Sequence, residues 1–169
     1  MRYNIENELK IRQILESITP FEIEFNQNYS DKFAYDLKCY KHIKNNTETG
    51  YEKKFMCFIE VEHGKSWNQK EFPERWELSF LQRKVCFYDY KNKMYLNELK
   101  ENGKNTIYLK TNLDFTNCYF NKIDFIFRNG TQSKRNTNNR LNNFLILKKE
   151  QSNFGWKSFT KYITNYCSI

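Results

Sequence analysis

The chain has 169 residues, 39% of them hydrophobic and 18% aromatic, and a formal net charge of +8. This length suits one domain with one core, and no run approaches the roughly 18 consecutive apolar residues of a membrane helix. The excess of basic residues predicts a polyanionic partner, with nucleic acid ahead of an anionic membrane surface. Plain solubility is the simpler reading of the same charge.

The N-terminal stretch MRYNIENELK has acidic residues and no apolar core, so it does not read as a signal peptide. The five cysteines form no CxxC pair, and only His42 and His63 accompany them, which disfavours a structural zinc site. Reduced thiols and a cytoplasmic location are therefore expected, or a nuclear one if the source is a eukaryote or its virus.

Residues 4–18 are predicted to form an amphipathic helix that ends before Pro20. Its apolar residues recur at steps of three and four and cover a wide arc. Glu8 falls inside that arc, so its carboxylate needs a partner. An ion pair with Arg12, one turn later, is the simplest partner.

Three strands should follow, over 21–25, 32–41 and 52–62, because apolar and polar residues alternate in each. The last two would form a hairpin around the polar turn 44–50. With a turn centred on Glu48, opposed residues have numbers that sum to 96. That register places Asp36 opposite Glu60, with Glu62 diagonal to Asp36, and keeps the apolar faces of both strands together.

The rest of the chain alternates between strands and polar segments. Residues 64–76 read as a connection, and 128–140 as a basic loop without acidic or large apolar residues. Strands are predicted over 77–90, 105–112 and 118–127, and a helix near the C-terminus. No repeat or long linker divides the chain, so residues 1–169 are expected to form one domain.

The hairpin register gathers three carboxylates, Asp36, Glu60 and Glu62, on one patch. A hard divalent cation would relieve their mutual repulsion, and Mg²⁺ prefers such oxygen ligands together with water and phosphate. Glu8, on a helix packed across the patch, could add a further ligand. An acidic metal pocket on a basic protein is the charge layout of an enzyme acting on nucleic acid.

A helix with Glu, a strand with Asp, a turn and a strand with Glu-x-Glu together resemble the PD-(D/E)XK nuclease superfamily. The resemblance covers roughly residues 4–85, with the motif read as Asp36 and then Glu60-Val61-Glu62. It implies an α/β, restriction-endonuclease-like fold with a central mixed β-sheet and flanking helices. It also implies phosphodiester hydrolysis with Mg²⁺, which Mn²⁺ can replace, and Asp36, Glu60 and Glu8 as metal ligands.

The sequence departs from this pattern where the family has its motif lysine, because Glu62 stands there. Some restriction enzymes of the superfamily also have Glu at this point, and Glu62 would then act as metal ligand or general base. A cation from elsewhere is the other solution. Lys65 is the candidate for the catalytic site, and the candidates for binding nucleic acid are Lys38, Arg83, Lys84, Lys134, Arg135 and Arg140.

The leading hypothesis is therefore a Mg²⁺-dependent DNA endonuclease of restriction, phage or repair type, acting as a homodimer that spans both strands. The alternative is a non-catalytic nucleic-acid-binding protein whose acids form an internal ion-pair network with Lys38 and Arg12. A protein that acts only by binding another protein is a third reading, which the sequence neither supports nor excludes.

Overall fold

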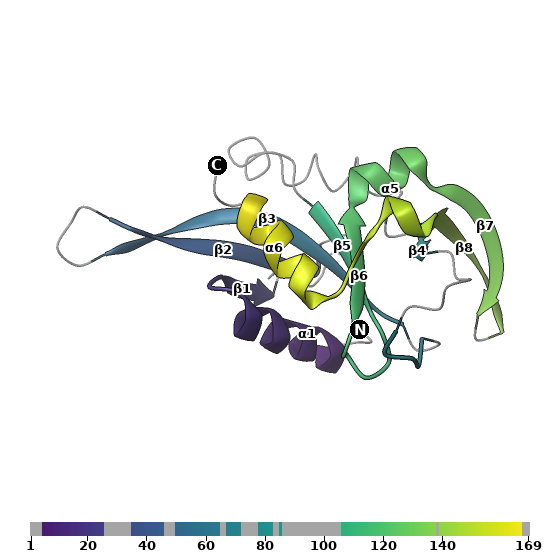
Figure 1. Ribbon diagram of the computed structural model, residues 1–169, viewed down its shortest axis with the longest axis horizontal. Helices are drawn as coiled ribbons and strands as arrows, with labels where there is room; N and C mark the ends of the chain where they lie inside the picture. The colour runs from purple at the N-terminus through teal and green to yellow at the C-terminus, as the bar shows by residue number, and fades with distance from the viewer. Residues whose placement is uncertain are drawn as a thin grey trace.

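The structure is a computed structural model that describes residues 5–25, 35–45, 50–64, 67–71, 78–82, 85, 106–137 and 139–166. Two β-sheets and three α-helices account for most of these residues (Figure 1). The helices are α1 (Ile5–Ile18), α5 (Ile123–Asn129) and α6 (Trp156–Tyr166), with a short 3₁₀ turn η1 (Lys149–Gln151) before α6. None of the helices in these ranges has the length and apolar character required to cross a bilayer.

The larger sheet has the strand order β1-β2-β3-β5-β6-β9. Its strands are β1 (Glu22–Phe25), β2 (Leu37–Lys44), β3 (Tyr51–His63), β5 (Thr106–Thr111), β6 (Cys118–Lys122) and β9 (Asn153–Phe154). Strands β3 and β5 run parallel and their neighbours antiparallel, so the sheet is mixed. The predicted α/β class, a central mixed sheet with flanking helices, is confirmed.

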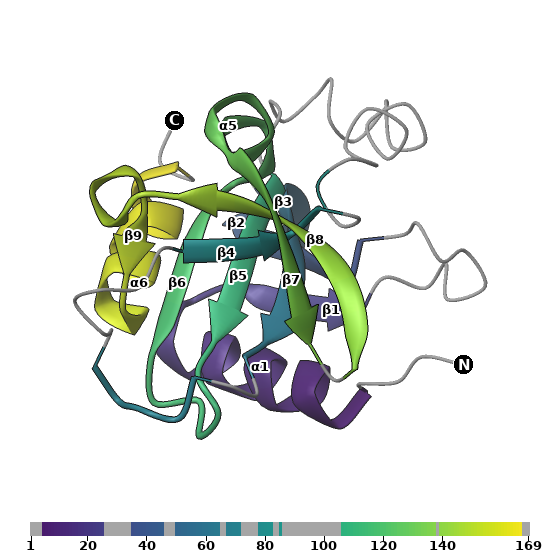
Figure 2. The ribbon, with the colours of Figure 1, turned by 90° about the vertical axis from the view of Figure 1, so that its right-hand side faces the viewer.

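The second sheet has the order β4-β8-β7. Its strands are β4 (Leu78–Leu81), β8 (Arg140–Leu147) and β7 (Thr131–Thr137). Figure 2 shows β4 crossing in front of β5 and β6, so the small sheet covers one face of the large one.

Two apolar clusters fill the spaces on either side of the large sheet. The first joins α1 and α6 to the sheet, with Ile11 and Phe159 fully buried. The second joins β4, β8 and α5 to the opposite face, with Phe80 and Tyr108 fully buried. Residues that alternate along β3 therefore point into different layers, as Ile59 points to the helices and Phe58 to the small sheet.

The predicted helix and hairpin register are confirmed where they matter for the site. Helix α1 covers the predicted range, and the pairs Leu37–Ile59, Lys38–Phe58 and Cys39–Cys57 keep the predicted sum of 96. Beyond Cys39 a β-bulge shifts the register by one residue. The sequence did not show this bulge, because each strand alternates well on its own.

Three predictions about elements are corrected. The segment 118–127 is not one strand, because the chain leaves β6 at Lys122 and continues as α5. The strand predicted over 77–90 is shorter, since β4 ends at Leu81. The segment 128–140 is not a loop: most of it is strand β7, which pairs with β8 along its whole length. Its polar composition misled the prediction, because backbone pairing with the half-buried β8 stabilises it.

Candidate functional site

Asp36 lies at a bend directly before β2, rather than within the strand as the hairpin arithmetic suggested. The bend separates its neighbours, with Tyr35 in the cluster under the small sheet and Leu37 in the cluster under the helices. Its carboxylate Oδ2 accepts a hydrogen bond of 2.8 Å from the backbone N–H of Val61. If β2 continued in the hairpin register, Tyr35 would lie opposite Val61, and a backbone carbonyl of β2 would accept the Val61 N–H. The carboxylate of Asp36 takes the place of that carbonyl. Asp36 is thereby fixed beside the Glu-x-Glu segment.

Glu60 and Glu62 lie on β3 and share the face of the sheet that the small sheet covers. Glu60 is only 3% exposed and pairs in register with Tyr108 of β5, while Glu62 pairs with Lys110. Asp36, at 8% exposed, lies at the same end of the hairpin. The structure thus brings the two predicted metal-binding carboxylates, Asp36 and Glu60, to neighbouring positions on adjacent parts of the hairpin.

Glu62 is held by two side chains from the neighbouring strand. Its Oε1 lies 3.0 Å from the ammonium Nζ of Lys110, and its Oε2 accepts a hydrogen bond from the hydroxyl of Tyr108. The side chains of the ion pair are 10% and 14% exposed, so water has little access to them. This environment suits Glu62 to orienting Lys110 more than to activating a water molecule.

Burial alone would lower the pKa of Lys110, but the charge of Glu62 and their hydrogen bond raise it above its usual value. Lys110 is therefore an ammonium ion at neutral pH. Burial, and then the charge of Glu62, raises the pKa of Tyr108 as well, so Tyr108 stays a neutral hydrogen-bond donor. Lys110 is therefore a fixed positive charge beside the carboxylate of Glu62.

Strand β4 covers this cluster and supplies further partners. The backbone N–H of Leu81 donates to the Tyr108 hydroxyl at 3.3 Å. Ser79 accepts hydrogen bonds at its carbonyl from Lys110, at 3.3 Å, and from the hydroxyl of Tyr119, at 2.8 Å. The small sheet therefore both excludes water from the site and fixes the rotamer of Lys110.

Glu8 of α1 is 5% exposed, which agrees with its predicted place inside the packing arc of the helix. Arg12, its predicted partner, forms an ion pair with Glu16 at 3.2 Å and lies over the ring of Phe25. Helix α1 covers the face of the sheet opposite the small sheet. The expectation that this helix packs across the face of Glu60 and Glu62 is therefore wrong. The role of Glu8 as a metal ligand stays a prediction.

The other predicted cations lie in different parts of the molecule. Lys38 pairs in register with Phe58 and so shares the face of Glu60, while Lys134, Arg135 and Arg140 are exposed on the β7–β8 hairpin. Three further candidates lie outside the described residues, namely Lys65, Arg83 and Lys84.

Lys110 is the cation that accompanies the site, and it was not among the residues predicted from the sequence. Lys110 lies on a strand that the sequence did predict, on the face opposite Ile107 and Leu109. A lysine that is buried on such a strand needs an anionic partner. Nothing in the sequence, however, shows that β5 lies parallel to β3 in the register that pairs Lys110 with Glu62.

The donor set fits some metals and not others. No group of three or more histidine, cysteine or acidic side chains in the described ranges could hold a metal ion by itself. Mg²⁺ does not require such a cage, since it usually takes one or two carboxylates and completes its shell with water and phosphate oxygens. Asp36 and Glu60 match that pattern, and a closed structural zinc site does not fit them.

Comparisons with known proteins give little beyond this geometry. No protein-family model matches the chain, and no curated protein matches it. Among solved structures, D212, a nuclease from a fusselovirus, is similar with a TM-score of 0.42 and 14% identity, over 97% of this chain and 90% of that one. Chains that differ this much need not share a substrate or a mechanism, so the residues of the site themselves must support a function.

Proposed function

We propose that this chain is a metal-dependent nuclease that hydrolyses phosphodiester bonds in DNA. The observation that carries the proposal is the joint placement of three groups at one end of the β2–β3 hairpin. Asp36 and Glu60 are buried carboxylates beside one another on the hairpin, and Lys110 enters from the parallel strand β5. Two acids and a cation in this order are the set that the PD-(D/E)XK resemblance implies, with Lys110 in place of the missing motif lysine.

In this proposal Asp36 and Glu60 would hold Mg²⁺ or Mn²⁺. The bound metal would polarise a phosphate oxygen and make a bound water more acidic. The Val61 N–H orients Asp36 by its hydrogen bond, and the second sheet limits the access of bulk water to the site. The chain's own contribution is thus a rigid pair of oxygen donors in a nearly dry layer.

Lys110 would stabilise the negative charge that develops on the phosphate in the transition state. A fixed ammonium in a site of low water content is effective for this purpose, because it needs no reorganisation during the reaction. Glu62 is then a positioning residue: it holds Nζ of Lys110 at 3.0 Å and keeps it charged. This role replaces the general-base role that the sequence suggested for Glu62.

Nucleic acid is the substrate class that the charge favours. The chain has a net charge of +8, although its candidate site is acidic. Exposed cations at Lys134, Arg135 and Arg140, all on the β7–β8 hairpin, could contact phosphates of the same substrate.

The test is cleavage of supercoiled plasmid and of single-stranded DNA with Mg²⁺, Mn²⁺ or a chelator. We expect cleavage by the wild type with metal, loss of it with chelator, and loss in Asp36→Asn and Glu60→Gln. Lys110→Met should lower the rate by roughly 10²–10³-fold, the usual effect of removing one donor that stabilises transition-state charge. Glu150→Gln removes an exposed carboxylate of η1 that takes part in none of the site contacts described above, and it should cleave normally.

A non-catalytic nucleic-acid-binding protein is the second candidate, and one observation favours it. The contacts of Glu62 with Lys110 and Tyr108 also describe a purely structural ion-pair network. DNA binding by the wild type without cleavage in any metal would support this candidate and refute the nuclease.

A further inference from the structure

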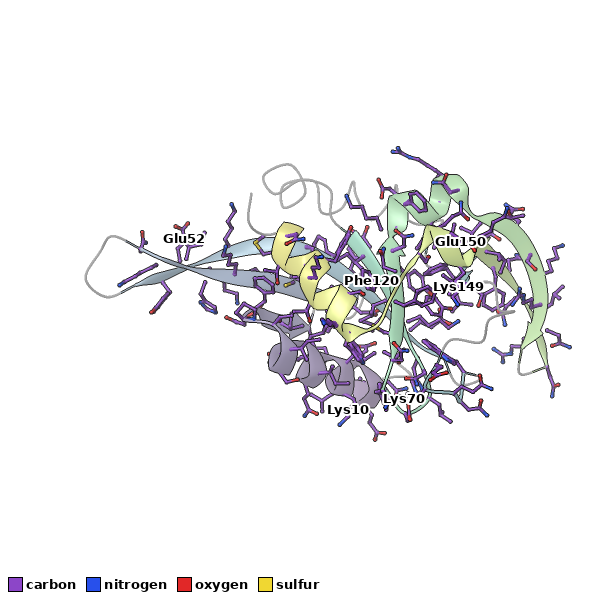
Figure 3. All side chains as sticks on the ribbon, in the orientation of Figure 1. Lys10, Glu52, Lys70, Phe120, Lys149 and Glu150 are labelled. Atoms are coloured by element: carbon purple, nitrogen blue, oxygen red, sulfur yellow. The ribbon has the colours of Figure 1, made fainter. Side chains whose placement is uncertain are left out.

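The β2–β3 hairpin continues well past the body of the molecule, as Figure 1 shows. We call this extension the distal arm and define it as Lys41–Lys44 of β2 and Tyr51–Lys54 of β3, which pair with one another. All of these residues are exposed except Lys41, which is half-buried. Glu52 marks the arm in Figure 3, at the opposite end of the molecule from Lys149 and Glu150. The arm therefore contributes little to the core.

The distal arm is strongly basic. It contains four lysines and one glutamate, Glu52. Lys41 lies directly opposite Lys54 in the strand pairing. Like charges at directly opposed positions destabilise a sheet, typically by about 0.2–1 kcal/mol. A ribbon that keeps such a pair is suited to a partner that brings negative charge.

One lysine of the arm already has acidic partners within the chain. Lys53 lies 2.8 Å from Glu22 and also contacts Glu24 of β1, and it lies over the ring of Tyr40. These contacts brace the base of the arm against β1. Lys41, Lys44 and Lys54 supply the rest of the positive charge of the arm.

The arm also offers apolar and aromatic contacts between its lysines. Tyr51 is 71% exposed and Ile43 is 38% exposed. Protein–protein interfaces are depleted in lysine, whereas phosphate-binding surfaces are rich in it. A two-stranded β-ribbon also has the width that the major groove of B-DNA admits. Nucleic acid fits this combination of charge and shape better than another protein does.

We propose that the distal arm is a nucleic-acid-binding β-ribbon that contacts duplex DNA on one side of the candidate active site. Lys54 and Glu60 lie six residues apart on the same strand, at most about 20 Å at roughly 3.3 Å per residue. At 3.4 Å per base pair this separation corresponds to about six base pairs. The spacing of about six base pairs between the arm and a cut depends on the proposed nuclease function. The binding of DNA by the arm does not depend on it.

The binding test compares two triple variants that remove the same charge. The arm variant is Lys41→Gln, Lys44→Gln and Lys54→Gln. The control variant is Lys10→Gln, Lys157→Gln and Lys161→Gln, which neutralises exposed lysines of α1 and α6. Affinity for a fluorescent duplex of about 30 base pairs is measured by anisotropy with chelator present, at about 50 to 200 mM salt.

We expect the arm variant to bind more weakly and to flatten the plot of log affinity against log salt. Each lost phosphate contact changes that slope by about 0.9, so three contacts change it by about 2.7. The control variant should change it much less. An equal effect of both variants, or none from the arm variant, would overturn the proposal, because the charge would then act diffusely.

Two further measurements separate the remaining explanations. If the arm instead pairs with a second copy of the chain, the arm variant will change the sedimentation behaviour and leave DNA binding intact, which also refutes the proposal. If the protein cleaves DNA, shortening the duplex on one side to fewer than about six base pairs should slow cleavage by the wild type but not by the arm variant. If nothing is cleaved in any metal, the nuclease proposal fails while the binding result still decides the role of the arm.

Discussion

The ion pair between Lys110 and Glu62 provides the sharpest test of how this site is built. The perturbations are Lys110→Met, Glu62→Gln and the double variant. Methionine fills nearly the volume of the lysine stem without its charge, and glutamine keeps the shape of Glu62 and an acceptor for Tyr108. Each single variant leaves one charged group in a nearly dry layer, whereas the double variant leaves none.

The expected size of the effect follows from the geometry. Two unit charges 3.0 Å apart attract with about 5.5 kcal/mol at an effective dielectric constant of about 20. Removing one partner of a buried pair usually destabilises a protein by about 3–5 kcal/mol. The pair is 10% and 14% exposed, so water can relieve part of the penalty, and we expect about 3 kcal/mol for each single variant. The double variant should lie within about 1 kcal/mol of the wild type, because no charge is left unpaired.

Urea unfolding followed by circular dichroism measures all four proteins of this cycle. If each single variant loses less than about 1 kcal/mol, the pair behaves as a surface ion pair and the burial argument is wrong. If the losses of the single variants add in the double variant, the two groups do not compensate each other. The double variant also separates stability from catalysis, since it should fold well and yet lack the activity that depends on Lys110.

Three further predictions concern alkaline pH, the core and the packing beside the site. Burial raises the pKa of Tyr108 and of the Cys118 thiol, so at alkaline pH the folded state keeps protons that the unfolded state loses. Thermal melts should therefore show stability falling above about pH 9. Constant stability to about pH 10.5 would contradict this prediction. Phe120→Ala removes a fully buried ring and should cost about 3–5 kcal/mol in urea unfolding, whereas Phe125→Ala, on the exposed side of α5, should cost under about 0.5 kcal/mol. Gly64→Ala would place a Cβ 2.7 Å from a backbone carbonyl oxygen of β5, so we expect the free energy of unfolding to fall by about 1–3 kcal/mol. If the variant is as stable as the wild type, the backbone moves apart there at little cost.

The sequence alone determined the local elements of the site. The periodicity of α1 placed Glu8 on its packing side, and alternation along the hairpin specified the register around Cys39 and Cys57. These features depend on neighbouring residues and on burial of one face, because a slip of one residue would turn the apolar side chains to the wrong layer. The acids of β3 could therefore be recognised without a structure.

Only the tertiary structure decided which groups meet those acids. Lys110 and Tyr108 reach Glu62 because β5 lies parallel to β3, and a parallel pairing leaves no mark in the local sequence of either strand. The polar segment of β7 becomes a strand because β8 satisfies its backbone hydrogen bonds. The bend at Asp36 likewise depends on a distant donor, the Val61 N–H. Local pattern thus specified the acids, and long-range pairing supplied the cation and the cover that surround them.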